Sequence, residues 1–160
     1  MTANVIGLVG NPNCGKTTLF NVLTGTRQRV GNWPGVTVEK KTGLFEHTKR
    51  LIEVVDLPGT YALTSHDSDG ALDERIAQSF LTDGSARLIV NIVDASNLER
   101  NLYLTVQLLE MGLPVIVALN MMDVARDRRL RIDVDRLARR LGCPVIPMVA
   151  ARRMGIQHRY

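Results

Sequence analysis

Short apolar runs alternate along the chain with segments in which apolar residues recur every three or four positions. The runs predict strands near 4–9, 42–47, 51–56, 88–94, 114–119 and 144–148. The periodic segments predict helices near 16–24, 71–82, 98–111 and 133–141. This alternation is typical of a mostly parallel sheet with helices on both faces, and 42–47 with 51–56 would form one antiparallel hairpin. The pattern predicts an α/β domain with a six-stranded sheet, spanning 1–160.

Two long polar stretches, 25–41 and 57–70, interrupt this alternation. Loops of that length in a compact α/β domain usually serve a function. Both follow the ends of predicted elements, on the side where open α/β sheets bind ligands. We therefore expect the functional site on that side.

The length of 160 residues and the ordinary content of apolar and charged residues, 45% and 22%, indicate a soluble globular domain. The apolar runs are too short to span a bilayer, and no signal peptide opens the chain. Cys14 and Cys143 are expected at opposite ends of the sheet and therefore unpaired, as in a reducing compartment. We expect a cytosolic protein, which could be part of a longer one.

The net charge of +4 is concentrated near the end of the chain, where residues 124–160 hold 10 Lys and Arg against 3 Asp and Glu. No aromatic residues lie among these arginines, so the pattern favours a solvated helix face and a docking surface for a following segment. A surface for nucleic acid or membrane remains the alternative.

The strongest motif is a phosphate loop, GxxxxGK[ST], directly between a predicted strand and a predicted helix. Glycines and a helix N-terminus direct backbone N–H groups at phosphates. Lys16 would reach the terminal phosphates, and the Thr17 hydroxyl would bind Mg²⁺. The sequence therefore predicts binding of a nucleoside triphosphate by Gly10, Asn11, Pro12, Asn13, Cys14, Gly15, Lys16, Thr17 and Thr18.

A second motif, DxxG, follows the predicted strand 51–56 and reads Asp56-Leu57-Pro58-Gly59. Asp56 would hold Mg²⁺ through water, and the Gly59 N–H would meet a γ-phosphate. Thr37, in the long loop, would bind Mg²⁺ only when a γ-phosphate is present, and Gly35 and Val36 before it are expected to contribute to nucleotide binding.

A third motif, Asn120-Met121-Met122-Asp123, follows the predicted strand 114–119 and selects the base. The Asp123 carboxylate accepts both N1–H and the exocyclic amine of guanine, whereas adenine would leave it unpaired. Such a mismatch separates substrates by roughly 10⁴. Asn120 would tie the base to the phosphate loop. The backbone of Val149-Ala150-Ala151 would donate to guanine O6.

With these motifs in this order, and with the string GNWPGVTVE at 31–39, the chain resembles the amino-terminal GTPase domain of the ferrous iron transport protein B (FeoB) family over about 5–149. The resemblance implies GTP hydrolysis on the cytoplasmic face of the bacterial inner membrane. It implies attachment to helical and transmembrane domains, contact with small accessory Feo proteins, and no nucleic-acid partner. It also implies that Asn13, with backbone groups of 31–33, binds K⁺ near the phosphates, so that Lys16, Asn13, Thr37 and Gly59 surround the reacting phosphate.

Several features depart from that pattern. Cys14 stands where Ser is usual, and its position beside Lys16 at a helix N-terminus predicts thiolate character; a tolerated small residue is the alternative. Residues 149–155 lack the usual Ser or Thr, and no closing helix follows the last predicted strand. Thr60-Tyr61 after DxxG is part of the resemblance and not a departure from it. These residues offer no glutamine to orient water, so slow intrinsic hydrolysis is expected.

Two other functions stay open. A freestanding GTPase of ribosome or tRNA maturation would fit the arginine-rich end, and a P-loop ATPase or kinase is disfavoured by Asp123. Scattered His47, His66 and His158 form no ligand cluster, so we expect no iron site in this chain.

Overall fold

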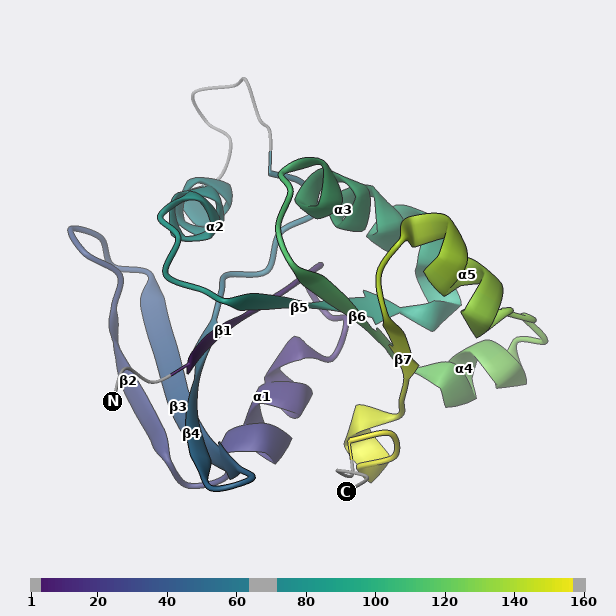
Figure 1. Cartoon of the computed structure of the whole chain (residues 1–160), viewed down its shortest axis with the longest axis horizontal. Coiled ribbons are helices and arrows are strands. Elements are labelled where there is room, and N and C mark those ends of the chain that lie inside the picture. Colours follow the sequence, from purple (N-terminus) through teal and green to yellow (C-terminus); the bar gives the residue numbers. More distant parts are fainter. Residues whose placement is uncertain (1–3, 64–71, 157–160) are drawn as a thin grey trace.

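The chain folds into one twisted sheet between two layers of helices, and the computed structural model describes residues 4–63 and 72–156 (Figure 1). The strands are β1 (Asn4–Gly10), β2 (Gln28–Asn32), β3 (Glu39–His47), β4 (Arg50–Asp56), β5 (Leu88–Asp94), β6 (Val115–Asn120) and β7 (Val145–Pro147). The helices are α1 (Lys16–Thr24), α2 (Leu72–Thr82), α3 (Leu98–Glu110), α4 (Met122–Asp127) and α5 (Val134–Leu141), with 3₁₀ turns η1 (Ala95–Asn97) and η2 (Ala150–Arg152).

The sheet has the order β2-β3-β4-β1-β5-β6-β7. The five strands from β4 to β7 are parallel, and β2, β3 and β4 pair antiparallel. In Figure 1, α1 and η2 lie against one face, whereas α2, α3 and α5 lie on the other. The mostly parallel sheet, the hairpin and the helices on both faces are therefore confirmed.

The predicted number of strands was wrong: within residues 4–63 and 72–156 the sheet has seven strands, not six. The additional strand, β2, lies in the stretch expected to be a loop, and all its residues are exposed. Such a strand has no buried face, so no alternation of apolar and polar residues marks it. Its backbone pairs with β3 from Gln28↔Gly43 to Asn32↔Glu39. Helix α4 was also not predicted, because six residues are too few to show a period.

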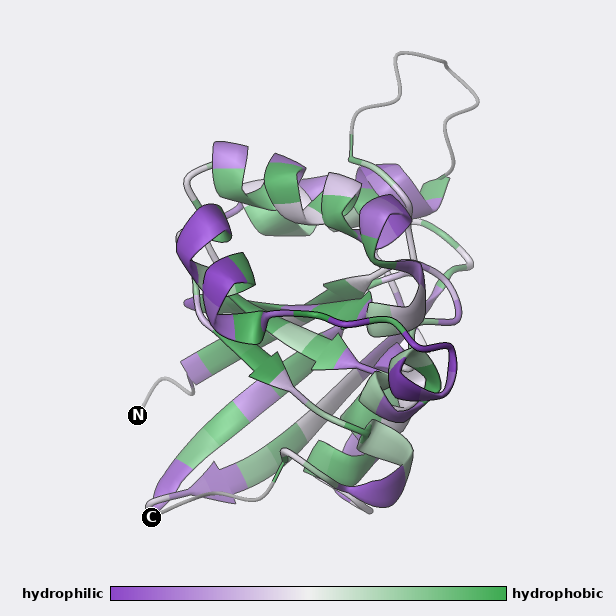
Figure 2. Cartoon of the chain, turned by 90° about the vertical axis from the view of Figure 1, so that its right-hand side faces the viewer, coloured by the Kyte–Doolittle hydropathy of each residue, from purple (hydrophilic) through white to green (hydrophobic). Residues whose placement is uncertain are grey.

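The hydrophobic core has two parts, one on each face of the sheet. Leu8 and Val9 are adjacent on β1, are fully buried, and belong to different parts. Leu8 packs in the cluster with Leu19 and Phe20 of α1, whereas Val9 belongs to the larger cluster that includes Leu104 of α3. Figure 2 shows the hydrophobic residues on the central strands and hydrophilic ones along the outer helices.

None of the helices in the described part of the chain has the length and apolar character needed to cross a bilayer.

Candidate functional site

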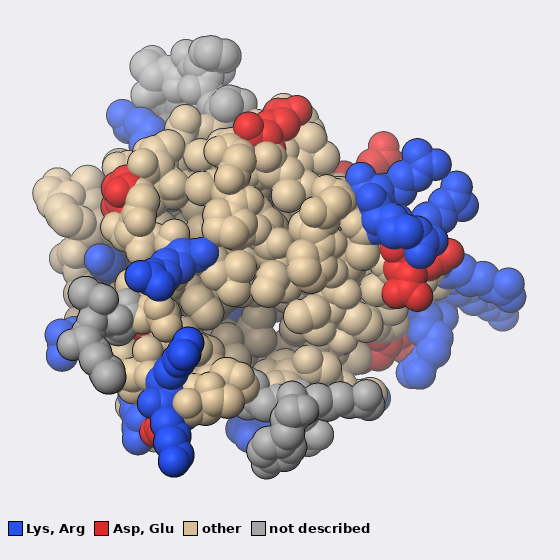
Figure 3. Space-filling view, viewed as in Figure 1, with Lys and Arg blue, Asp and Glu red and all other residues tan. Residues whose placement is uncertain are grey.

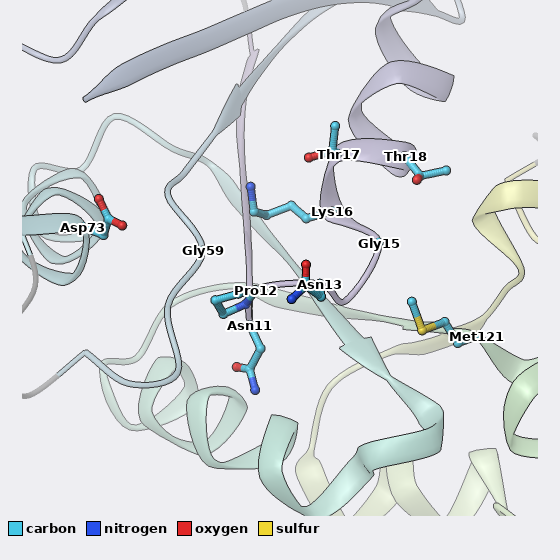
Figure 4. A pocket seen from close by; sticks show the side chains of 10 residues that line it. All are labelled: Asn11, Pro12, Asn13, Gly15, Lys16, Thr17, Thr18, Gly59, Asp73 and Met121. Atoms are coloured by element: carbon cyan, nitrogen blue, oxygen red, sulfur yellow. The ribbon is translucent and has the colours of Figure 1, made fainter. Parts of the chain in front are cut away.

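The phosphate loop connects the buried end of β1 to the first turn of α1. Asn13 and Gly15 have positive φ angles of 65° and 94°, and the helix begins at Lys16. The loop forms part of a cavity of about 570 Å³ (Figure 4). The cavity is lined by Asn11, Pro12, Asn13, Gly15, Lys16, Thr17, Thr18, Gly59, Asp73 and Met121. The structure thus brings residues of the loop, of DxxG and of NxxD to one site.

Two features of the backbone require glycine at position 15. Its φ of 94° is in the left-handed region, and a Cβ there would lie 2.2 Å from Nδ2 of Asn120. The loop therefore passes so close to the end of β6 that no side chain fits between them.

DxxG lies beside the phosphate loop. The Lys16 ammonium forms an ion pair and hydrogen bond with Oδ1 of Asp56, and these two side chains are only 12% and 11% exposed. The Thr60 N–H donates to the carbonyl of Gly10 at 3.0 Å, and a Cβ at Gly59 would lie 3.3 Å from Cα of Pro12. The cation of the loop and the acid of DxxG therefore meet in a sheltered position, where a phosphate and a metal ion would compete for them.

Asn120 joins the phosphate loop to the loop after β7. Its Nδ2 donates to the carbonyl of Cys14 at 3.0 Å, and its Oδ1 accepts from the Ala150 N–H at 2.9 Å. Asn120 is 4% exposed. Met121, next to it, has a φ of 60° and lines the cavity. The half-buried Asp123 lies in the first turn of α4, where its Oδ1 accepts from the neighbouring Val124 N–H at 2.9 Å.

Several predicted residues lie outside the cavity lining. Gly10, Cys14, Leu57, Val149 and Ala150 are buried and do not line it. Gly35, Val36, Thr37, Asp56, Pro58, Asn120, Asp123 and Ala151 are also not among the lining residues. Thr37 is exposed, in a segment closed by a hydrogen bond from the Trp33 N–H to the Val38 carbonyl. Its contact with magnesium stays a prediction.

Asp73 is a site residue that sequence reasoning missed. It lies in the first turn of α2, and Figure 4 shows it on that helix across the cavity from the phosphate loop. The only signal in the sequence was an acidic first turn, which many helices share for reasons of their dipole.

The expectation of thiolate character at Cys14 was wrong. Its thiol is 1% exposed, and burial raises its pKa to about 11, although the Lys16 N–H and ammonium lower it. Burial also raises the pKa of Cys143. Both cysteines are free, so the prediction that they do not pair is confirmed.

The arginines of 126–140 are exposed, and Figure 3 shows basic side chains gathered at the end of the molecule formed by α4 and α5. Their role as a docking surface stays a prediction. In residues 4–63 and 72–156, no three His, Cys, Asp or Glu side chains gather as a metal site would require.

A helix-covered, mostly parallel sheet with this phosphate loop and two further motifs at its strand ends defines a P-loop GTPase fold of the Ras-like class. A family model described as ferrous iron transport protein B matches residues 4–159, and the chain belongs to that family.

Named relatives agree with this assignment. The chain is 63% identical to the Fe(2+) transporter FeoB of Salmonella typhimurium and 62% identical to that of Escherichia coli K12, over 95% of this chain. It spans about a fifth of the length of each, namely 20%.

Solved structures agree as well. The cytosolic domain of L. pneumophila FeoB matches with a TM-score of 0.92 and 55% identity, over 96% of this chain and 65% of that one. A GDP-bound mutant of the S. thermophilus NFeoB matches with a TM-score of 0.88 and 49% identity, over 96% of this chain and 58% of that one.

Proposed function

We propose that this chain binds and hydrolyses GTP, and that it regulates or gates an attached ferrous iron transporter at the cytoplasmic face of the bacterial inner membrane. The observation that carries the nucleotide part is Asn120, which is bonded to Cys14 and Ala150 and so connects the phosphate end of the site to the predicted base end. The transport part is supported by the family and by the identity to Fe(2+) transporters.

The residues present fit a magnesium nucleotide. Asn13 and Gly15 have positive φ angles and α1 begins at Lys16, so N–H groups and the helix dipole would face bound phosphates. Thr17, Thr37 and Asp56 supply the hydroxyl and carboxylate oxygens that Mg²⁺ prefers. Bound Mg²⁺ would neutralise charge on the phosphates during transfer.

For the reaction, each residue of this chain has a distinct task. Lys16 would leave Asp56 and pair with the terminal phosphates, and the freed carboxylate would then be available to Mg²⁺. The backbone N–H of Gly59 would contact the γ-phosphate, and Asn13 with the backbone of 31–33 would hold K⁺. Because Thr60-Tyr61 offers no glutamine, the intrinsic rate would be slow, on the order of 10⁻³ s⁻¹ or less.

Calorimetry in magnesium buffer tests nucleotide choice. We expect heat on titration with GDP, and we expect the dissociation constant for ADP to be roughly 10⁴-fold higher than that for GDP. Equal affinity for the two nucleotides would contradict the guanine assignment, and no heat with either would contradict nucleotide binding.

Phosphate release in KCl and in NaCl tests the cation. We expect faster hydrolysis in KCl, and Asn13→Ala should remove the difference. A rate that is the same in both salts would contradict the K⁺ site.

Uptake of radioactive iron(II) by cells that carry the full-length protein tests the transport role. Lys16→Ala should remove GTP-dependent uptake. Unchanged uptake would contradict the link between GTP and transport. The same proposal includes contact of this chain with helical and transmembrane domains and with small accessory Feo proteins.

A further inference from the structure

A second cavity, of about 450 Å³, lies outside the nucleotide site, between the segment that follows β2 and helix α2. Its wall includes the apolar side chains of Trp33, Leu72, Ile76 and Phe80. Small organic ligands usually bind in cavities of this volume, with a mostly apolar lining and a few polar groups. No residue of this cavity belongs to the phosphate loop, to DxxG or to NxxD.

Trp33 lines this cavity and is held in place by contacts of its side chain and its backbone. The side chain is 7% exposed and packs edge-on against Phe80, with ring centroids 5.9 Å apart and planes at 77°. Its backbone is fixed on both sides, because the Trp33 N–H donates to Val38 and its carbonyl accepts from Val36. The indole N–H is buried and has no acceptor among the described residues. Because this nitrogen has almost no exposed surface, the indole N–H reports on the packing around Trp33 and is not itself a contact for a ligand in the cavity.

The charged groups around the cavity are mainly cationic. Lys40 lies with its ammonium 4.7 Å from the centre of the Trp33 ring, and Arg75 comes from α2. The acidic group of the lining, Asp83, already accepts a hydrogen bond from the Ser85 N–H at 2.7 Å. In the described part of the chain, neither Lys40 nor Arg75 forms an ion pair. The lining therefore carries two cations and one carboxylate, and the carboxylate already has a hydrogen-bond partner.

We propose that this cavity binds an amphipathic organic anion, with an aliphatic or flat aromatic body against Trp33 and Phe80 and a carboxylate between Lys40 and Arg75. The apolar wall accounts for the body, and the two cations account for the acid. A bound molecule would join α2 to the segment that carries Thr37. The inference does not depend on GTP hydrolysis or on iron transport.

The tryptophan itself provides the measurement, because the chain has one Trp and hence one indole N–H signal in a proton–nitrogen NMR spectrum. Octanoate is the probe, and octylammonium, with the same body and the opposite charge, is its control. We expect octanoate to shift the indole signal in a saturable way and octylammonium to leave it nearly unchanged. If the signal does not shift at octanoate concentrations up to about 10 mM, any dissociation constant lies above that value, and the proposal is overturned.

The chain offers a matched pair of variants on β3. Lys40→Gln removes the cation at the cavity, whereas Lys41→Gln removes the next one, which points to the other face of the strand. We expect Lys40→Gln to weaken octanoate binding about fivefold and Lys41→Gln to change it less than about twofold. Equal effects of the two variants, or an equal response to octylammonium, would show non-specific adsorption and overturn the proposal. A well-dispersed amide spectrum of each variant verifies that it is folded.

Discussion

Asn120→Ala should destabilise the domain even when no nucleotide is present. The side chain is 4% exposed and makes two hydrogen bonds to backbone groups that are distant in the sequence, the Cys14 carbonyl at 3.0 Å and the Ala150 N–H at 2.9 Å. Alanine removes both partners and leaves the two backbone groups buried. It also leaves a space beside Gly15, whose backbone approaches the Asn120 amide closely.

The expected size follows from these two groups. Each buried polar group left without a partner costs about 1–3 kcal/mol, so the free energy of unfolding should fall by about 2–6 kcal/mol. Against a total stability of about 5–15 kcal/mol for a domain, that is a large fraction. Urea denaturation followed by circular dichroism, without nucleotide, separates this loss from any change in ligand binding. Asn32→Ala, at an exposed position of β2, is the control and should stay within about 0.5 kcal/mol.

A loss below about 1 kcal/mol for Asn120→Ala, with an unchanged denaturant slope, would refute the reasoning. It would mean that solvent satisfies the Cys14 and Ala150 groups, and that Asn120 is not the connection that holds the two loops together.

Three further predictions concern the base, the packing of α1 and the thiols. Asp123→Asn should lower GDP affinity about a hundredfold or more and raise that for xanthosine diphosphate, whose 2-oxo group accepts from an amide; equal calorimetric affinities before and after would contradict it. Gly43→Ala should lower the urea midpoint strongly, because its Cβ would lie 2.3 Å from Cγ2 of Thr24. Gly31→Ala is the control and should leave the midpoint unchanged, because its Cβ would meet nothing within 4 Å. Similar midpoints for the two variants would contradict this packing. With its pKa raised to about 11, Cys14 should react with iodoacetamide more slowly than Cys143 at pH 8, as followed by mass spectrometry. Because the folded pKa exceeds the ordinary value of 9.0, the thiol should also cost stability as pH rises from 9 toward 11, and a flat stability profile over that window would argue against the burial effect.

The sequence predicted the elements that bury one face or both. Helix α1 and strand β5 have the predicted bounds, 16–24 and 88–94, because Leu19, Phe20 and Ile92 belong to the core and impose a regular pattern. Strand β2 has no such pattern, since the core does not reach it, and it is held by backbone pairing with β3 and by hydrogen bonds from the Gln28 side chain to α1. Local patterns predict burial, and they do not predict a strand whose residues are all exposed.

The sequence predicted contacts between distant segments only where a motif implied them. The motif predicted that Asn120 ties the base to the phosphate loop, and the structure shows it bonded to Cys14 and to Ala150. The Ala150 contact uses a backbone N–H, which any residue but proline supplies, so no letter of the sequence marks it. Asp73 reaches the cavity because of the position of α2, which the sequence pattern does not specify.

Cys14 shows why a motif is a poor guide to reactivity. The two effects that predicted a thiolate are present, because the N–H and the ammonium of Lys16 lower the pKa of Cys14. Desolvation is larger than both, and the charge of Asp94 acts in the same direction as desolvation. The neighbouring residues Asn13, Gly15 and Lys16 line the cavity, while the side chain at position 14 belongs to the core cluster with Leu8, Phe20 and Ile92. A residue can therefore stand in the middle of a phosphate-binding motif and belong to the hydrophobic core, so a small side chain is what this position requires.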